Sequence, residues 1–209
     1  MKKFFLLLSI TVSFFFLFSY GTSKDTKEIS GITHIESRKG SNTDQYEGIK
    51  NTLPEFSTIV DGHRQIYMSS CIPSSIEMVL KYLGKVDMDF YELQHAWKNK
   101  IDGSFRNFDG RTINGVRFDL KFDLPRNAGF PIDSLFTKID NELDNGKKVI
   151  ISLVSNTGWH MYVIDKKTPE GEYISYSKNF QQTLKVENTR EIVKRMQGTD
   201  IMTYSIMEE

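Results

Sequence analysis

Apolar residues in the first half of the chain recur three and four positions apart, which is the spacing of one face of a helix. This spacing predicts helices over residues 73–83, 90–99 and 131–145. Pro73 and Gly84 fit the two ends of the first helix, because proline is tolerated in a first turn and glycine commonly ends a helix. Glycines interrupt residues 101–131, so loops or short strands are expected there.

In the second half of the chain, apolar residues become continuous or alternate with polar ones, which is typical of strands. Strands are expected over residues 149–154, 160–165, 172–177, 184–187 and 202–206. A helix-rich half followed by sequentially adjacent strands predicts an α+β domain, in which the helices pack on an antiparallel sheet.

The amino-terminal residues follow a third pattern. Lys2 and Lys3 precede an uncharged stretch rich in Phe and Leu, and small residues stand before a possible cleavage point after Gly21. This pattern is typical of a secretory signal peptide over residues 1–21, with a retained membrane anchor as the alternative. We therefore expect export to the periplasm or the cell exterior, without stable membrane association once the signal peptide is removed.

The composition is that of one globular domain. The 209 residues are 39% hydrophobic and carry a formal net charge of +0. This is enough apolar surface for a single core, and the balanced charge gives no reason to expect nucleic acid or an anionic membrane as a partner. Residues 22–50 are polar and predict a flexible arm, which leaves residues 51–209 as the expected folded domain.

The single cysteine of the chain, Cys71, stands directly before the first predicted helix. Exported proteins usually pair their cysteines in disulfides, so a lone thiol requires a reason. The thiolate is the nucleophilic form, and the start of a helix lowers the pKa of a thiol. Cys71 is therefore a candidate nucleophile, with a buried structural thiol and an intermolecular disulfide as alternatives.

A cysteine nucleophile needs a base and a set of donors for the oxyanion that forms on the substrate. His160 begins a predicted strand and is the candidate base, ahead of His34, His63 and His95. The side-chain amide of Gln65 is the candidate oxyanion donor, together with the backbone N–H of Cys71.

A third group should hold the imidazole in its productive tautomer. The strand expected over residues 172–177 offers Ser175 or Ser177, and Asn179 follows just past its end. Asn179 is preferred, because an amide orients an imidazole without carrying a charge. The sequence has no spacing typical of a metal site or a phosphate loop, so neither a metal nor a cofactor is expected.

Two segments resemble the papain-like cysteine peptidases, in particular the bacteriocin-processing peptidases that cleave double-glycine leaders. One segment runs from Gln65 to Cys71 and on through IPSSIEMVLKYLG, and the other is KKVIISLVSNTGWHMYVI, which contains His160. The similarity covers about residues 61–180. It implies a papain-like fold with Cys71 as nucleophile, His160 as general base and Gln65 as oxyanion donor.

Two positions depart from the pattern of that family. Ile72 stands where a glycine usually follows the nucleophile, and Tyr176-Ser177 stands where an Asp-Pro pair supplies the orienting acid. The expected function is an exported thiol hydrolase that cleaves a peptide or isopeptide bond in a peptide or protein substrate. The alternatives are a catalytically impaired domain that binds a peptide or protein partner, and a deamidase or acyltransferase on the same scaffold.

Overall fold

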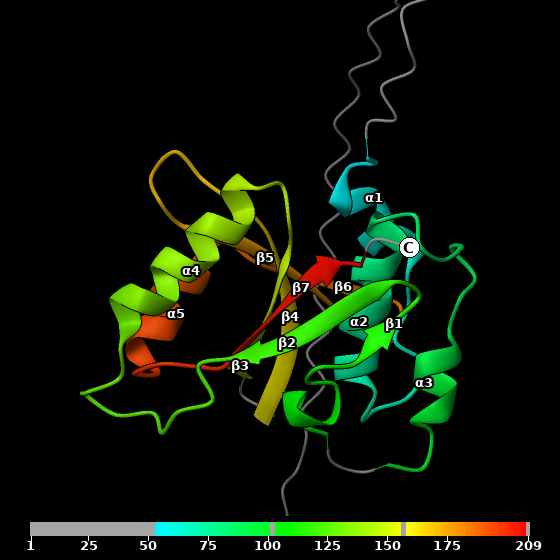
Figure 1. Cartoon of the computed structure of the whole chain (residues 1–209), viewed down its shortest axis with the longest axis horizontal. Helices are drawn as coiled ribbons and strands as arrows, with labels where there is room; N and C mark the ends of the chain where they lie inside the picture. Colours follow the sequence, from blue (N-terminus) through cyan, green and yellow to red (C-terminus); the bar gives the residue numbers. More distant parts are fainter. Residues whose placement is uncertain (1–52, 101–102, 156–157, 208–209) are drawn as a thin grey trace, which may run out of the picture. The chain divides into compact units, whose positions relative to one another are not determined.

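The computed structural model describes residues 53–100, 103–155 and 158–207. The predicted signal peptide and polar arm lie outside the described residues. Within the described residues, an antiparallel sheet of seven strands in the order β1-β2-β7-β3-β4-β5-β6 carries helices on both faces (Figure 1). The α+β class expected from the sequence is confirmed.

The helices are α1 (Phe56–Gly62), α2 (Cys71–Tyr82), α3 (Glu92–Ala96), the short 3-10 helix η1 (Phe105–Asn107), α4 (Ile132–Asp144) and α5 (Thr189–Arg195). Four of these helices precede the first strand, and α4 and α5 stand between strands in the chain order. The strands are β1 (Thr112–Ile113), β2 (Val116–Lys121), β3 (Val149–Ser155), β4 (Gly158–Lys167), β5 (Tyr173–Asn179), β6 (Gln182–Val186) and β7 (Ile201–Ile206).

Successive side chains of the central strands point to opposite faces of the sheet, so each strand contributes to two cores. In β4, Met161 and Val163 join the core that α1 and α2 cover, whereas Tyr162 and Ile164 join the core that α4 and α5 cover. Figure 1 shows the same division, with α1 and α2 on one side of the strands and α4 and α5 on the other. This double burial explains the continuous apolar run in the sequence of β3.

Several element boundaries differ from the sequence prediction. Helix α2 begins at Cys71 rather than at Pro73, so the cysteine is the first helical residue. Proline is accommodated there because the N–H groups of a first turn have no partner within the helix. Helix α3 is shorter than expected, and α1 and α5 were not expected, because each has seven residues and buries only two or three of them.

Gly198 lies against Phe130, which belongs to the core that α4 and α5 cover. It has φ +113, and a Cβ there would lie 2.2 Å from Cγ of Phe130. We expect Gly198→Ala to lower the free energy of unfolding by about 3 kcal/mol, because backbone strain and a clash add together. Gly171→Ala is the control, since Gly171 has φ +88 but open space around it. Urea denaturation of both variants makes the comparison, and equal losses would contradict the clash.

Candidate functional site

Cys71 and His160 line the same cavity, which has a volume of about 400 Å³. Helix α2 contributes Cys71 as its first residue, and β4 contributes His160 near its start. The remaining lining residues are Met68, Ser69, Ile72, Gly103, Trp159 and Met161. The structure thus brings the candidate nucleophile and the candidate base to one cavity, although no hydrogen bond joins their side chains in the part of the chain that the structure describes.

The environment of the sulfur opposes ionisation. Burial raises the pKa of the Cys71 thiol, and this effect outweighs the lowering by backbone hydrogen bonds from Met161, Ile72 and Cys71 itself. The start of the helix does lower this pKa, as expected, but the net shift is upward because the sulfur is largely withdrawn from water. The thiol is protonated at neutral pH.

The start of α2 nevertheless offers two donors beside the sulfur. The first intrahelical hydrogen bond runs from the N–H of Ser74 to the carbonyl of Ser70, at 2.8 Å. Pro73 has no N–H, so the N–H groups of Cys71 and Ile72 are the donors of this first turn that the helix itself does not use. Both face the side of the helix that carries the thiol, since both contact the sulfur.

Strand β5 holds the imidazole of His160. Its Nε2 lies 3.2 Å from the carbonyl oxygen of Lys178 and 2.8 Å from Oγ of Ser177. A carbonyl only accepts, so Nε2 carries the proton, and Nδ1 is the basic atom of the neutral ring. Ser177 in turn donates to the carbonyl of Met161 at 2.5 Å. Burial lowers the pKa of His160 more than the hydrogen bond to Lys178 raises it, so the ring is neutral at pH 7.

The side chain of β5 that contacts His160 is not the one preferred from the sequence. Asn179 is exposed at the end of β5, where it pairs with Gln182 of β6, and no hydrogen bond to His160 is found for it among the described residues. Ser177, one of the alternatives, occupies that place. The reason is that β5 extends to Asn179, so Ser177 lies within the strand and beside β4.

Gln65 is buried next to the site but is not part of the cavity lining. Its Nε2 donates to the carbonyls of Tyr67 at 2.8 Å and Met68 at 3.0 Å. Both amide hydrogens are therefore used within the loop that leads to Cys71, and neither is available for an oxyanion in this conformation. In the structure Gln65 shapes this loop, so the predicted oxyanion role would require its side chain to change partners.

Sequence analysis did not identify Gln94 of α3, the residue that anchors this loop. Its fully buried carboxamide accepts from the N–H of Ile66 at 2.8 Å and from Oγ of Ser70 at 2.8 Å, and it donates to the carbonyl of Arg64 at 3.1 Å. It also donates to Glu77 of α2 at 2.7 Å. Gln94 thus ties the loop before Cys71 to two helices.

The hydrogen bonds from Gln94 only partly offset the burial of Glu77. Burial raises the pKa of this carboxyl group to about 7. A polar residue 28 positions from its loop partner has no periodicity that sequence analysis could detect, which is why this anchor was missed.

His63, one of the competing histidines, has both ring nitrogens occupied. Its Nε2 lies 3.0 Å from Oγ of Ser74, and its Nδ1 accepts from Nζ of Lys81 at 2.9 Å. Burial, reinforced by the nearby positive charge of Lys81, lowers the pKa of His63 to about 2. His63 is therefore a structural residue behind α2, and it does not serve the thiol. His95 bonds to the hydroxyl of Tyr67 at 3.0 Å, and His34 lies outside the described residues.

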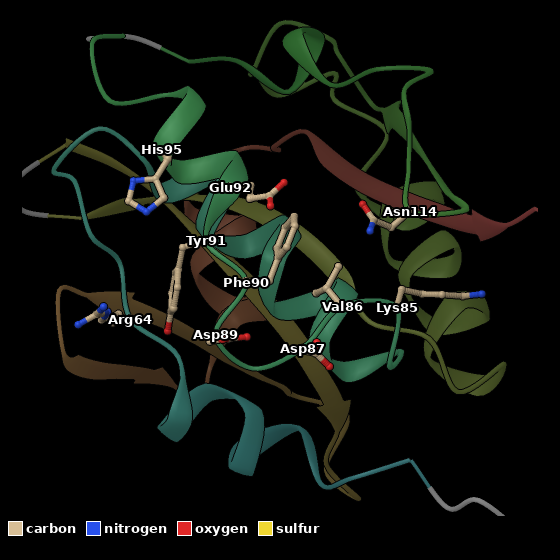
Figure 2. A pocket seen from close by; sticks show the side chains of 10 residues that line it. All are labelled: Arg64, Lys85, Val86, Asp87, Asp89, Phe90, Tyr91, Glu92, His95 and Asn114. Atoms are coloured by element: carbon tan, nitrogen blue, oxygen red, sulfur yellow. The ribbon is translucent and has the colours of Figure 1, made fainter.

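A larger hollow of about 730 Å³ lies along α3 and the turn before it (Figure 2). Arg64 lies near the ring of Tyr91 on one side of it, with 5.2 Å from the guanidinium carbon to the ring centroid. Both acidic and basic side chains line this hollow, and neither Cys71 nor His160 is among its lining residues. The chemistry predicted from the sequence therefore belongs to the smaller cavity. Among the described residues, no group of three acidic, histidine or cysteine side chains could hold a metal ion.

Comparisons with known proteins add no relative to this picture. The chain matches no protein-family model, no curated protein and no solved structure. Over the described ranges, none of the helices has the length and apolar character needed to cross a membrane.

The buried His63 makes stability depend on pH. Its pKa is about 2 in the folded protein and about 6.5 in the unfolded chain, so unfolding takes up a proton below pH 6.5. Wild-type protein should therefore lose stability relative to His63→Gln by up to about 1.4 kcal/mol per pH unit as the pH falls below 6.5. Urea denaturation of both proteins between pH 7.5 and pH 4.5 measures this difference. A difference that stays constant over that range would contradict the neutral, buried state of His63.

Proposed function

We propose that the chain is an exported, papain-like thiol hydrolase that cleaves a peptide or isopeptide bond, with Cys71 as nucleophile and His160 as base. The observation that carries the proposal is the shared cavity, in which β5 holds Nε2 of the imidazole and leaves Nδ1 as its basic atom. The arrangement of a cysteine at the first position of a buried helix, packed on an antiparallel sheet, supports the same assignment.

In the proposed reaction the free enzyme holds a neutral thiol and a neutral imidazole. His160 accepts the thiol proton on Nδ1 as the sulfur of Cys71 attacks the carbonyl carbon of the substrate. The resulting oxyanion accepts hydrogen bonds from the backbone N–H groups of Cys71 and Ile72. The imidazolium then gives its proton to the leaving amine, which leaves an acyl-enzyme thioester. His160 next takes a proton from a water molecule, which hydrolyses the thioester and restores the thiol.

Ser177 and the carbonyl of Lys178 act through His160. Once the ring is protonated, both of its N–H groups donate, and the contacts at Nε2 keep the ring plane fixed during the transfer. A serine in this place provides a hydrogen bond without the negative charge that an aspartate would add. The imidazolium is therefore less stabilised here than in an acid-bearing triad.

A second candidate function has two specific observations in its favour. The raised thiol pKa and the engaged amide of Gln65 are what a peptide-binding domain without catalysis would also display. Such a domain would bind its peptide equally well after Cys71→Ala, and its thiol would show no reactivity beyond that of a buried cysteine.

Alkylation of Cys71 by iodoacetamide at pH 7 separates these two functions. A buried thiol with a raised pKa reacts more slowly than the denatured chain, whereas a thiol assisted by an imidazole reacts about tenfold faster or more. We expect wild-type protein to react faster than its denatured form and His160→Ala to react more slowly. The exposed histidine His95 supplies the control variant His95→Ala, which should match wild type. Native protein that reacts more slowly than denatured protein would contradict the proposal.

The orienting role of Ser177 predicts a contrast within one strand. Ser177→Ala removes a contact to Nε2 and should slow alkylation of Cys71 about tenfold. Asn179→Ala, at the exposed end of the same strand, should change the rate less than about twofold. Rates measured from pH 5 to pH 9 also report the pKa of the base, which should move in Ser177→Ala alone. The opposite ranking of the two variants would restore Asn179 as the orienting residue.

A further inference from the structure

A second cavity adjoins the one that holds Cys71. It has a volume of about 230 Å³, and it shares the lining residues Gly103, Trp159 and Met161 with the first. Because the same three residues border both cavities, the two cavities form adjoining parts of one groove. Its outer part, away from Cys71, adds Phe105 and four charged or polar residues, which are Ser104, Arg126, Ser152 and Asp200.

Trp159 stands between the two parts and is held in place although it is 47% exposed. The guanidinium carbon of Arg126 lies 3.8 Å from the centroid of its ring, and Nη2 of Arg126 donates to Asp200 at 3.0 Å. A stacked guanidinium that is itself fixed by an ion pair restricts the indole. The wall is therefore in position before any ligand arrives, and ligand binding need not order it.

The inner part of the groove favours apolar groups. Met68 is 84% exposed and Trp159 is partly exposed at this part of the groove, and the largely buried Ile72 and Met161 complete its apolar lining. Apart from Cys71 and His160, the described lining of this part contains no ionisable side chain. A charged group placed there would lose water without gaining a partner, whereas an apolar group would cover exposed side chains. Large apolar residues exposed together at a cavity are typical of a ligand contact.

We propose that this groove selects substrates with a bulky apolar side chain next to the bond that Cys71 attacks, with Trp159 as the specificity-determining residue. Arg126 and Asp200 are positioning residues, since they act by holding the indole. The inference rests on the proposed function, because it concerns the substrate of the same thiol. It narrows the substrate class to peptides with an aromatic or large aliphatic residue at that position.

The test compares two neutral alkylating probes, N-benzyl iodoacetamide and iodoacetamide itself. For each probe, the rate with folded protein is divided by the rate with the denatured chain, which removes differences in intrinsic reactivity. We expect the normalised rate of the benzyl probe to exceed that of iodoacetamide about tenfold. Trp159→Ala should abolish this preference, and Trp159→Phe should retain most of it.

Two further variants distinguish a specific effect of the Trp159 wall on probe preference from a general effect on the fold. Arg126→Gln should reduce the preference by raising the concentration of the benzyl probe that gives the half-maximal rate. The rate at saturation should change little. Ile206→Ala removes another exposed apolar residue outside the groove and should change nothing. A benzyl preference that is absent from wild type, or that survives Trp159→Ala, would overturn the proposal.

The two probes also distinguish failure of the hydrolase proposal from failure of the groove assignment. If both probes react more slowly with folded than with denatured protein, but the benzyl preference is present and depends on Trp159, the hydrolase proposal fails and the groove assignment holds. If both react faster with folded protein without any preference, the thiol is activated and the groove assignment is wrong.

Discussion

The contact between the start of helix α2 and strand β4 is the constraint on which the candidate site depends. Every residue of α2 after Cys71 is buried, so the helix has little freedom to slide or rotate over the sheet. Its first residue is thereby fixed against the backbone of Met161, next to His160. The position of the thiol follows from the packing of the whole helix, and the position of the imidazole follows from the register of β4.

A buried polar network supports this contact from the other side. Gln94 and Glu77 are almost inaccessible to water. Gln94 donates a hydrogen bond to the carboxylate of Glu77, and it also binds the loop that leads to Cys71. Buried polar groups are expensive to leave unpaired, so the loop is held as strictly as the helix. The network thus holds the loop that leads to Cys71 without contacting the thiol itself.

The same burial sets the chemistry. It keeps Cys71 protonated and His160 neutral in the free protein, so the proposed reaction begins with proton transfer within the site and not with a preformed ion pair. An apolar cavity wall around the thiol strengthens this tendency, because it removes water that would stabilise the charges. The side chains of Met68 and Trp159 are the parts of that wall that are exposed to solvent.

Sequence analysis predicted the parts of this architecture that depend on periodicity. Helices α2 and α4 and strands β3, β4 and β5 bury long apolar stripes or runs, and the α+β class followed from their order. The short helices α1 and α5 bury too few residues to produce such a pattern. The pairing of Cys71 with His160 at one cavity was also expected, because each stands at the start of an element.

What the sequence did not contain is the geometry between elements. The choice of Ser177 over Asn179 depends on how far β5 extends and how it lies beside β4, and no single segment encodes that. The raised pKa of Cys71 depends on burial by residues distant in the sequence, which outweighs the local effect of the helix start. The partners of Gln65 are carbonyls of its own loop, whose path is set by Gln94.

The most direct test of the account is the protonation state of the ring nitrogens of His160, measured by ¹⁵N NMR above its pKa. We expect a proton on Nε2 and none on Nδ1, together with a shift of the Nδ1 signal when Cys71 is alkylated. A proton on Nδ1, or ring signals of His160 that do not respond to alkylation of the thiol, would contradict the claim that thiol and imidazole act together across one cavity.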